Sequence, residues 1–206
     1  IIDALAGKIL LATISHTKKL INSLKYFYDE LKRSWERIIK RRLTIPDSIT
    51  EIKNGAYKCC KINSVIIGNS VSTIGESAFH SCESLTSIAI PDSVTAIEAS
   101  AFAHTGLTEI VVANSVTEIS EYTYADCKGF VNITIPDTIT KIRRDAFRSC
   151  EKIKSITLHP SITEIENDFY SDHWKERLKT IYIPVGMTDH FKQILHERYH
   201  KLIVEK

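Results

Sequence analysis

A short motif that recurs about every 23 residues is the feature that most limits how this chain can fold. Its anchor is Ile-Pro, and the successive anchors are 22, 23, 22, 23, 23 and 25 residues apart. A fixed period in this range indicates a solenoid, in which each repeat forms one coil of a stack. The anchors are Ile45-Pro46, Ile67-Gly68, Ile90-Pro91, Val112-Ala113, Ile135-Pro136, Leu158-His159 and Ile183-Pro184, three of them in altered form.

Each repeat contains three segments with inward-facing apolar residues. The alternating pattern I-x-I, rich in β-branched residues, predicts a short strand. Proline ends that strand because it has no N–H to donate to a ladder. The next segment, S-V-T-x-I, turns the chain, and Ala-Phe or its equivalent fills the far side of the coil. One coil cannot bury its inner face alone, so stacked coils share a continuous core and the terminal coils need caps.

The cysteines follow the same register. Four of the five lie three residues after the aromatic residue of their coil, and a threonine takes that place in the third coil. This spacing predicts a column of buried free thiols, because zinc sites favour cysteine pairs spaced as C-x-x-C, and that spacing is absent here. The fifth cysteine, Cys59, is expected to be exposed. The column consists of Cys60, Cys82, Thr105, Cys127 and Cys150.

The repeat I-x-I-P-x-S-V-T-x-I-x-x-x-A-F-x-x-C-x-x-L resembles the BspA-like, Treponema-type leucine-rich repeat. The resemblance covers roughly residues 43–185, and the ending IYIPVGMTDHFKQIL looks like the final strand and helix that often close such arrays. It implies an α/β solenoid, a leucine-rich repeat array of short parallel strands. It also implies a cell-surface or secreted protein that adheres to host matrix proteins or other cells.

The first 42 residues depart from the repeat. They carry ten Lys and Arg against four Asp and Glu, a net charge of +6, whereas residues 43–206 carry 17 against 21, a net charge of −4. Apolar residues at 3/4 spacing predict an amphipathic helix over about residues 17–41. That helix is either a cap for the first coil or a segment for oligomer assembly or membrane-surface contact.

Three regions are therefore expected. Residues 1–42 form an N-terminal helical cap or assembly segment, residues 43–185 a solenoid of about six coils, and residues 186–206 a C-terminal capping helix. The last helix is expected over residues 188–202, with Thr188 or Asp189 as its N-cap. No apolar run is long enough to span a membrane, and the sequence contains no recognisable signal peptide.

The candidate binding site is the outward side of the strands. If the I-x-I residues point inward, the residues between and before them point outward. They are small, mostly uncharged and β-prone, which favours recognition of a broad protein partner by shape and hydrogen bonds rather than by long-range charge. They are Ser64, Ile66, Ser87, Ala89, Glu109, Val111, Asn132, Thr134, Ser155, Thr157, Thr180 and Tyr182.

These features favour a non-enzymatic protein-binding or adhesion module, with a host or matrix protein as the expected partner. The alternative is a structural scaffold assembled through residues 17–41. No catalytic residue and no cofactor is predicted, and the net charge of +2 is too small to indicate a nucleic-acid partner. The motif HERYH at 196–200 matches the zinc-protease signature H-E-x-x-H. A zinc peptidase is the remote alternative, because no third ligand is evident; His196 and His200 are expected to bind metal only adventitiously.

Overall fold

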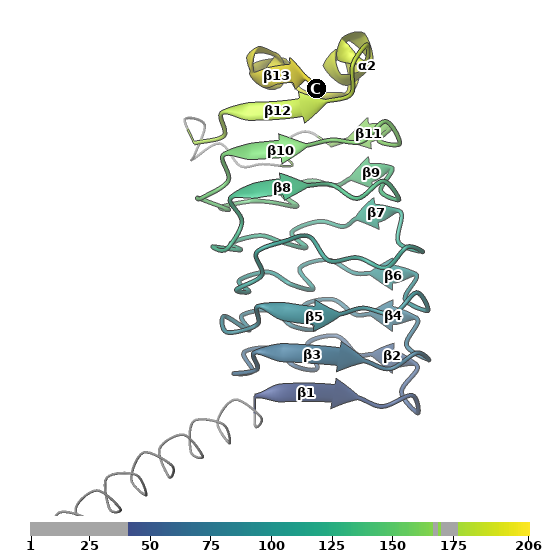
Figure 1. Ribbon diagram of the computed structural model, residues 1–206. Coiled ribbons are helices and arrows are strands. Elements are labelled where there is room, and N and C mark those ends of the chain that lie inside the picture. The colour runs from purple at the N-terminus through teal and green to yellow at the C-terminus, as the bar shows by residue number, and fades with distance from the viewer. Residues whose placement is uncertain (1–40, 167–168, 170–176) are drawn as a thin grey trace, which may run out of the picture. The chain divides into compact units, whose positions relative to one another are not determined.

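A computed structural model describes residues 41–166, 169 and 177–206. The compact unit Arg42–Lys206 is a solenoid of about seven turns, in which equivalent residues of successive coils lie side by side (Figure 1). Every strand pair is parallel, as a solenoid wound in one direction requires. The prediction of a leucine-rich repeat array with short parallel strands is confirmed. Of the predicted helix over residues 17–41, residues 17–40 lie outside the described residues.

The first side of each coil carries the strands predicted from I-x-I. They form two parallel sheets, ordered β1-β3-β5 and β8-β10-β12-β13. Figure 1 shows both sheets stacked along the same side of the array. The strands are β1 (Arg42–Ile45), β3 (Ser64–Ile67), β5 (Ser87–Ala89), β8 (Asn132–Thr134), β10 (Ser155–Thr157), β12 (Thr180–Ile183) and β13 (Ile203–Glu205).

The second side carries two-residue strands from the S-V-T-x-I segment. These also form two sheets, β2-β4-β6 and β7-β9-β11. Serine and threonine hydroxyls reinforce this side by donating to backbone carbonyls of the preceding coil, as Ser93 does to Val71 O at 2.8 Å. The strands are β2 (Glu51–Ile52), β4 (Thr73–Ile74), β6 (Ala96–Ile97), β7 (Glu118–Ile119), β9 (Lys141–Ile142) and β11 (Glu164–Ile165).

The third side has no strands but has its own hydrogen-bond system, which we call the turn ladder. In the first four coils the aromatic residue and the residues two before and two after it donate their N–H groups to carbonyls of the next coil. One chain of such bonds runs from Tyr57 to Ala78, from Phe79 to Ala101 and onward to Phe169, with N···O distances of 2.8 to 3.0 Å. The turn ladder is continuous from Gly55 to Phe169.

Left-handed backbone conformations make the turn ladder possible. The residues two before and two after each aromatic residue have φ between 56° and 63°. Only the first of them is glycine, although this conformation costs other L-residues roughly 1–2 kcal/mol each. The inter-coil bonds and the packing of the aromatic residues offset that cost. The residues are Gly55, Cys59, Ser77, Ser81, Ser100, His104, Tyr122, Asp126, Asp145 and Ser149.

The core consists of columns, one side chain per coil. The most prominent is the aromatic column behind the turn ladder, whose neighbouring rings stack with centroids 5.4 to 5.9 Å apart and planes 6 to 20° from parallel. Burying one such side chain contributes about 1.5–3 kcal/mol relative to leaving it exposed. The column contains Tyr57, Phe79, Phe102, Tyr124 and Phe147.

The cysteine column is present as predicted. All five thiols are free; Cys59 is exposed and Cys60 is half-buried, whereas the other three are buried. Burial is the main cause that raises the pKa of Cys82 and Cys127 to about 11. These buried groups are therefore thiols rather than reactive thiolates at neutral pH. Thr105 substitutes for cysteine by bonding both Phe102 O at 2.8 Å and the Cys127 sulfur at 3.3 Å.

The C-terminal region corrects the prediction of one helix over residues 188–202. Helix α2 (Thr188–Ile194) is only seven residues long, and Met187 rather than Thr188 or Asp189 is its N-cap. Extended backbone at Leu195 and His196 ends it, and a 3-10 helix η2 (Glu197–Leu202) follows. The apolar residues whose spacing suggested one helix still belong to the core, because Phe191, Leu195 and Tyr199 are all buried. The chain then returns as β13, which pairs with β12.

Candidate binding face

The outward-pointing residues of the first side form columns that cross the strands, and we call this surface the sheet face. Their inward neighbours are buried, as in Val65, Ile88 and Ile133, so the predicted alternation is present. The register aligns equivalent residues of neighbouring coils directly. The aligned sets are Thr44–Ile66–Ala89, Ser64–Ser87, Asn132–Ser155–Thr180 and Thr134–Thr157–Tyr182.

Two of the twelve predicted residues are not part of a strand. Glu109 and Val111 lie in the fourth coil, between β5 and β8, where the chain forms neither strand nor bridge. Within the described residues, no backbone hydrogen bond joins residues 107–112 to the coil on either side. The sheet face is therefore divided into an N-terminal half of β1, β3 and β5 and a C-terminal half of β8, β10, β12 and β13.

A buried hydroxyl supports the backbone at this interruption. Tyr124 occupies the aromatic column where Phe is usual, and it is completely buried. Its hydroxyl donates to Val111 O at 2.7 Å, a carbonyl to which no backbone N–H of the described residues donates. Burial raises the pKa of Tyr124 above its ordinary value, which keeps the hydroxyl protonated as a donor. On the second side, Ser120 donates to Ile97 O at 2.6 Å between β6 and β7.

The sheet face extends further at the C-terminus than the sequence indicated. Strand β13 places Val204 beside Tyr182 in register, and Val204 is 46% exposed. The Lys206 ammonium lies 4.6 Å from the centre of the Tyr182 ring, within the range of a cation–π contact. The β-branched pair Ile203-Val204, directly after the helix predicted over residues 188–202, was the available signal, but two residues are too few to predict a strand.

The polar groups of the sheet face are mostly unused by the fold. Ser155 donates to the Asn132 side chain at 2.9 Å. Within the described part of the chain, the hydroxyls of Ser64, Ser87, Thr134, Thr157 and Thr180 make no hydrogen bond to protein atoms. The threonines and serines of the second side, by contrast, bond backbone carbonyls of neighbouring coils. Hydroxyls without internal partners can donate to or accept from a ligand.

The second side differs from the sheet face in charge as well. Arg143 lies between three carboxylates, at 2.7 Å from Glu118, 3.2 Å from Glu164 and 2.9 Å from Glu166. These hydrogen bonds, first of all the one to Glu118, raise the pKa of Arg143. The pKa of Glu166 is lowered, first by the Arg144 N–H that bonds its carboxylate and then by Arg143. Charge is thus paired internally on the second side, while the sheet face has few charges.

The HERYH segment does not have the geometry of the zinc-protease signature. That signature needs both histidines on one helix, one turn apart. His196 instead precedes η2, and its Nδ1 accepts from Arg198 N at 3.2 Å. His200 bonds Leu195 O through Nε2 at 3.0 Å. Among residues 41–166, 169 and 177–206, no group of three or more His, Cys, Asp and Glu side chains is arranged to hold a metal ion.

In the parts of the chain that the structure describes, no helix has the length and hydrophobicity needed to span a lipid bilayer. Residues 17–40 of the predicted assembly segment lie outside those parts.

Comparison with known proteins supports the repeat. The family model described as "BspA type Leucine rich repeat region" matches six copies over residues 36–131 and 117–200. A leucine-rich repeat protein from Bacteroides ovatus is 25% identical, with a TM-score of 0.55, over 70% of this chain and 43% of its own. The Treponema pallidum Leucine Rich Repeat protein is 21% identical with a TM-score of 0.55, over 76% and 84% of the two chains.

The pneumococcal vaccine antigen PcpA has the same fold at 16% identity, with a TM-score of 0.62, over 81% of this chain and 41% of its own. This chain therefore spans less than half the length of the Bacteroides protein and of PcpA. No curated protein matches the sequence at a significant level.

Proposed function

Because this chain belongs to the BspA-type leucine-rich repeat family, we propose that it is a non-enzymatic module whose sheet face binds a protein partner. The unused hydroxyls in register along the sheet face support this proposal most directly. A protein surface has the breadth to contact several coils at once, and each hydrogen bond to a hydroxyl adds a modest net stabilisation. A surface-associated or secreted location, with a host or matrix protein as partner, is part of the same proposal.

The C-terminal half of the sheet face is the part that we propose makes the main contact. Its four strands are hydrogen-bonded in one sheet, so its side chains are held at fixed spacing. It also contains the exposed Val204 and the half-buried Tyr182, and aromatic and aliphatic side chains are typical anchors of protein interfaces. The N-terminal half offers smaller residues, Ser64, Ser87 and Ala89, and contributes less contact area.

An array of immobilised matrix and cell-surface proteins, probed with the whole chain, tests the proposal. Thr134→Arg together with Thr157→Arg places two long side chains on the C-terminal half of the sheet face and should abolish a genuine hit. The matched control is Thr50→Arg together with Thr117→Arg, because these exposed threonines precede β2 and β7 on the second side. Partners that bind both double variants as well as the unmodified chain would place the contact elsewhere.

A further inference from the structure

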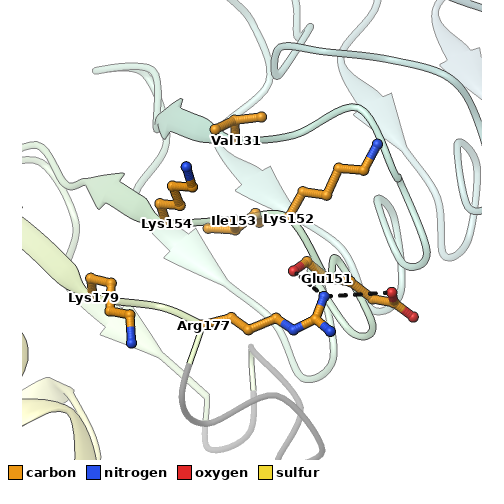
Figure 2. Close-up of a pocket in the computed structure, with 7 residues that line it drawn as sticks. All are labelled: Val131, Glu151, Lys152, Ile153, Lys154, Arg177 and Lys179. Carbon is orange, nitrogen blue, oxygen red and sulfur yellow. Dashed lines mark hydrogen bonds and ion pairs between the residues drawn. The ribbon is translucent and has the colours of Figure 1, made fainter.

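A pocket of about 720 Å³ opens beside the C-terminal half of the sheet face, where the chain enters β8, β10 and β12. Its lining is mainly basic: Lys152, Lys154, Lys179 and Arg177, with one acidic residue, Glu151. Figure 2 shows these side chains together with the apolar Val131 and Ile153. The surrounding array has a net negative charge over residues 43–206, 17 basic against 21 acidic residues, so this basic cluster is a local exception.

The repeat itself positions three of the lining residues. Val131, Lys154 and Lys179 occupy the same place in successive coils, immediately before Asn132, Ser155 and Thr180 of the sheet face. Lys154 N donates to Val131 O at 2.7 Å, and Lys179 N donates to Lys154 O at 2.8 Å. The backbone beneath the pocket is therefore fixed, and the pocket adjoins the outward column that starts each strand.

The basic residues of the pocket differ in whether they are paired with an acidic group. Arg177 is engaged with Glu151, donating to its backbone carbonyl at 3.0 Å and lying 3.7 Å from its carboxylate (Figure 2). Lys152, Lys154 and Lys179 form no ion pair with any described residue. The backbones of neighbouring coils in a parallel ladder are separated by only about 4.8 Å, so the long side chains of Lys154 and Lys179 start close enough to contact one anionic ligand together.

The apolar part of the pocket favours an anionic ligand that also has an apolar group. Val131 is 38% exposed, and the buried Ile153 lines the same pocket. A ligand that combines carboxylates with an apolar side chain would use both the lysines and Val131. We propose that this basic pocket binds an acidic segment of a protein, with its carboxylates on Lys152, Lys154 and Lys179 and an apolar side chain on Val131. This inference rests on the proposed function, since it identifies the kind of partner that the sheet face would receive.

Fluorescence anisotropy with a labelled peptide tests the pocket directly. The probe is Glu-Glu-Leu-Glu-Glu, its counterpart has Gln at every Glu, and both are titrated with the whole chain. Binding of the acidic peptide should weaken as salt is added, and the Gln counterpart should bind much less tightly. Lys154→Glu with Lys179→Glu should weaken the acidic peptide roughly tenfold or more. The matched control, Lys58→Glu with Lys61→Glu in the first coil, makes the same charge change on exposed lysines away from the pocket.

Three results would overturn the inference. One is equal affinity of the Lys154/Lys179 variant and its control for the acidic peptide, with thermal unfolding unchanged in both. Another is equal affinity of the acidic peptide and its Gln counterpart. The third is selective binding of a heparin hexasaccharide through the same lysines, which would assign the pocket to a sulfated glycan instead.

The two sets of variants test the pocket and the sheet face separately. A partner lost with the Thr134/Thr157 variant but unaffected by the Lys154/Lys179 variant would refute only the pocket. Peptide binding that is lost in the lysine variant and retained in the threonine variant would support the pocket even if the array yields no partner for the sheet face.

Discussion

The turn ladder and the sheet face differ in backbone conformation and in whether their hydrogen bonds continue through every coil. The turn ladder is continuous, and its backbone has left-handed residues at two positions in every fully described coil. The sheet face uses ordinary extended backbone, yet its sheet is interrupted at the fourth coil. The turn ladder, whose left-handed residues cost conformational energy, is thus the side that continues without interruption. The comparison teaches that the stack does not depend on the strands at every coil, because the aromatic column and the turn ladder hold the coils together where strands are missing.

The largest effect should follow from removing a ring from the centre of the aromatic column. Phe102→Ala deletes a side chain with no exposed surface that stacks on both Phe79 and Tyr124. We expect it to lower the free energy of unfolding by about 3–5 kcal/mol, measured by urea denaturation. Thr134→Ala on the sheet face is the control and should change stability little. A loss as large in Thr134→Ala would contradict the view that the aromatic column holds the coils together.

The same substitution should have different effects on the two sides. Ser100 has φ of 57°, a conformation that β-branched residues strongly disfavour, so Ser100→Val should destabilise by roughly 1–2 kcal/mol or more. Ser87 lies in strand β5, where valine is well tolerated, so Ser87→Val should be neutral or slightly stabilising. Thermal denaturation of the two variants checks this. Ser100→Gly, which relieves the strain, should keep nearly normal stability, and a failure of that variant would assign the loss to the serine side chain.

A smaller, local effect is expected at the interruption. Tyr124→Phe keeps the stacked ring but removes the donor to Val111 O, at a cost of about 1 kcal/mol. Amide hydrogen exchange should accelerate mainly over residues 107–113. Tyr57→Phe is the matched control, since Tyr57 lies in the same column and its hydroxyl makes no hydrogen bond among the described residues. If both variants exchange alike, the hydroxyl does not support the fourth coil.

The smallest effect is a pH dependence on the second side. The pKa of Glu166 in the folded protein is lowered by the Arg144 N–H and by Arg143, so its stabilising contribution is complete above the pKa of an unfolded Glu. That contribution is lost as the pH falls through the lowered folded pKa. Glu166 is partly exposed, so it should amount to no more than about 1 kcal/mol.

Unfolding in urea at pH 7 and pH 3 measures this contribution. Glu166→Gln should narrow the stability difference between the two pH values slightly, whereas Glu98→Gln, an exposed residue that forms no ion pair with the described residues, should leave it unchanged. If Glu166→Gln leaves the stability difference between pH 7 and pH 3 unchanged, the Glu166 carboxylate does not contribute to the pH dependence.

The features that repetition determines could be predicted from the sequence. The inward isoleucines, the aromatic column and the cysteine column each recur at one position of the period, so one inference applies to every coil. The interruption at residues 109–112 could not be predicted in this way, because Ile110-Val111-Val112 is as strand-like as Val65-Ile66-Ile67. Tyr124 in place of Phe indicates that a buried hydroxyl needs a partner there, but Tyr57 also replaces Phe, and its coil has the regular strand β1.

The C-terminal region was harder to predict because nothing there repeats. The spacing of Phe191, Leu195 and Tyr199 fits one helix, but burial of the same residues is equally satisfied by a short helix followed by a 3-10 turn. The basic pocket was missed for a different reason. Lys154 and Lys179 are 25 residues apart in the sequence and become neighbours only through the register of the coils.

The turn ladder also gives the array an electrical polarity. Its N–H groups all point toward the following coil and its carbonyls toward the preceding one, as in Gly55 to Glu76 and Ser77 to Ala99. These peptide dipoles add along the axis, as they do in an α-helix, whereas the dipoles of a β-sheet largely cancel. Each added coil therefore lengthens a dipole whose negative end is at the first coil. A molecule that approaches the turn side meets a field that depends on which end of the array it reaches.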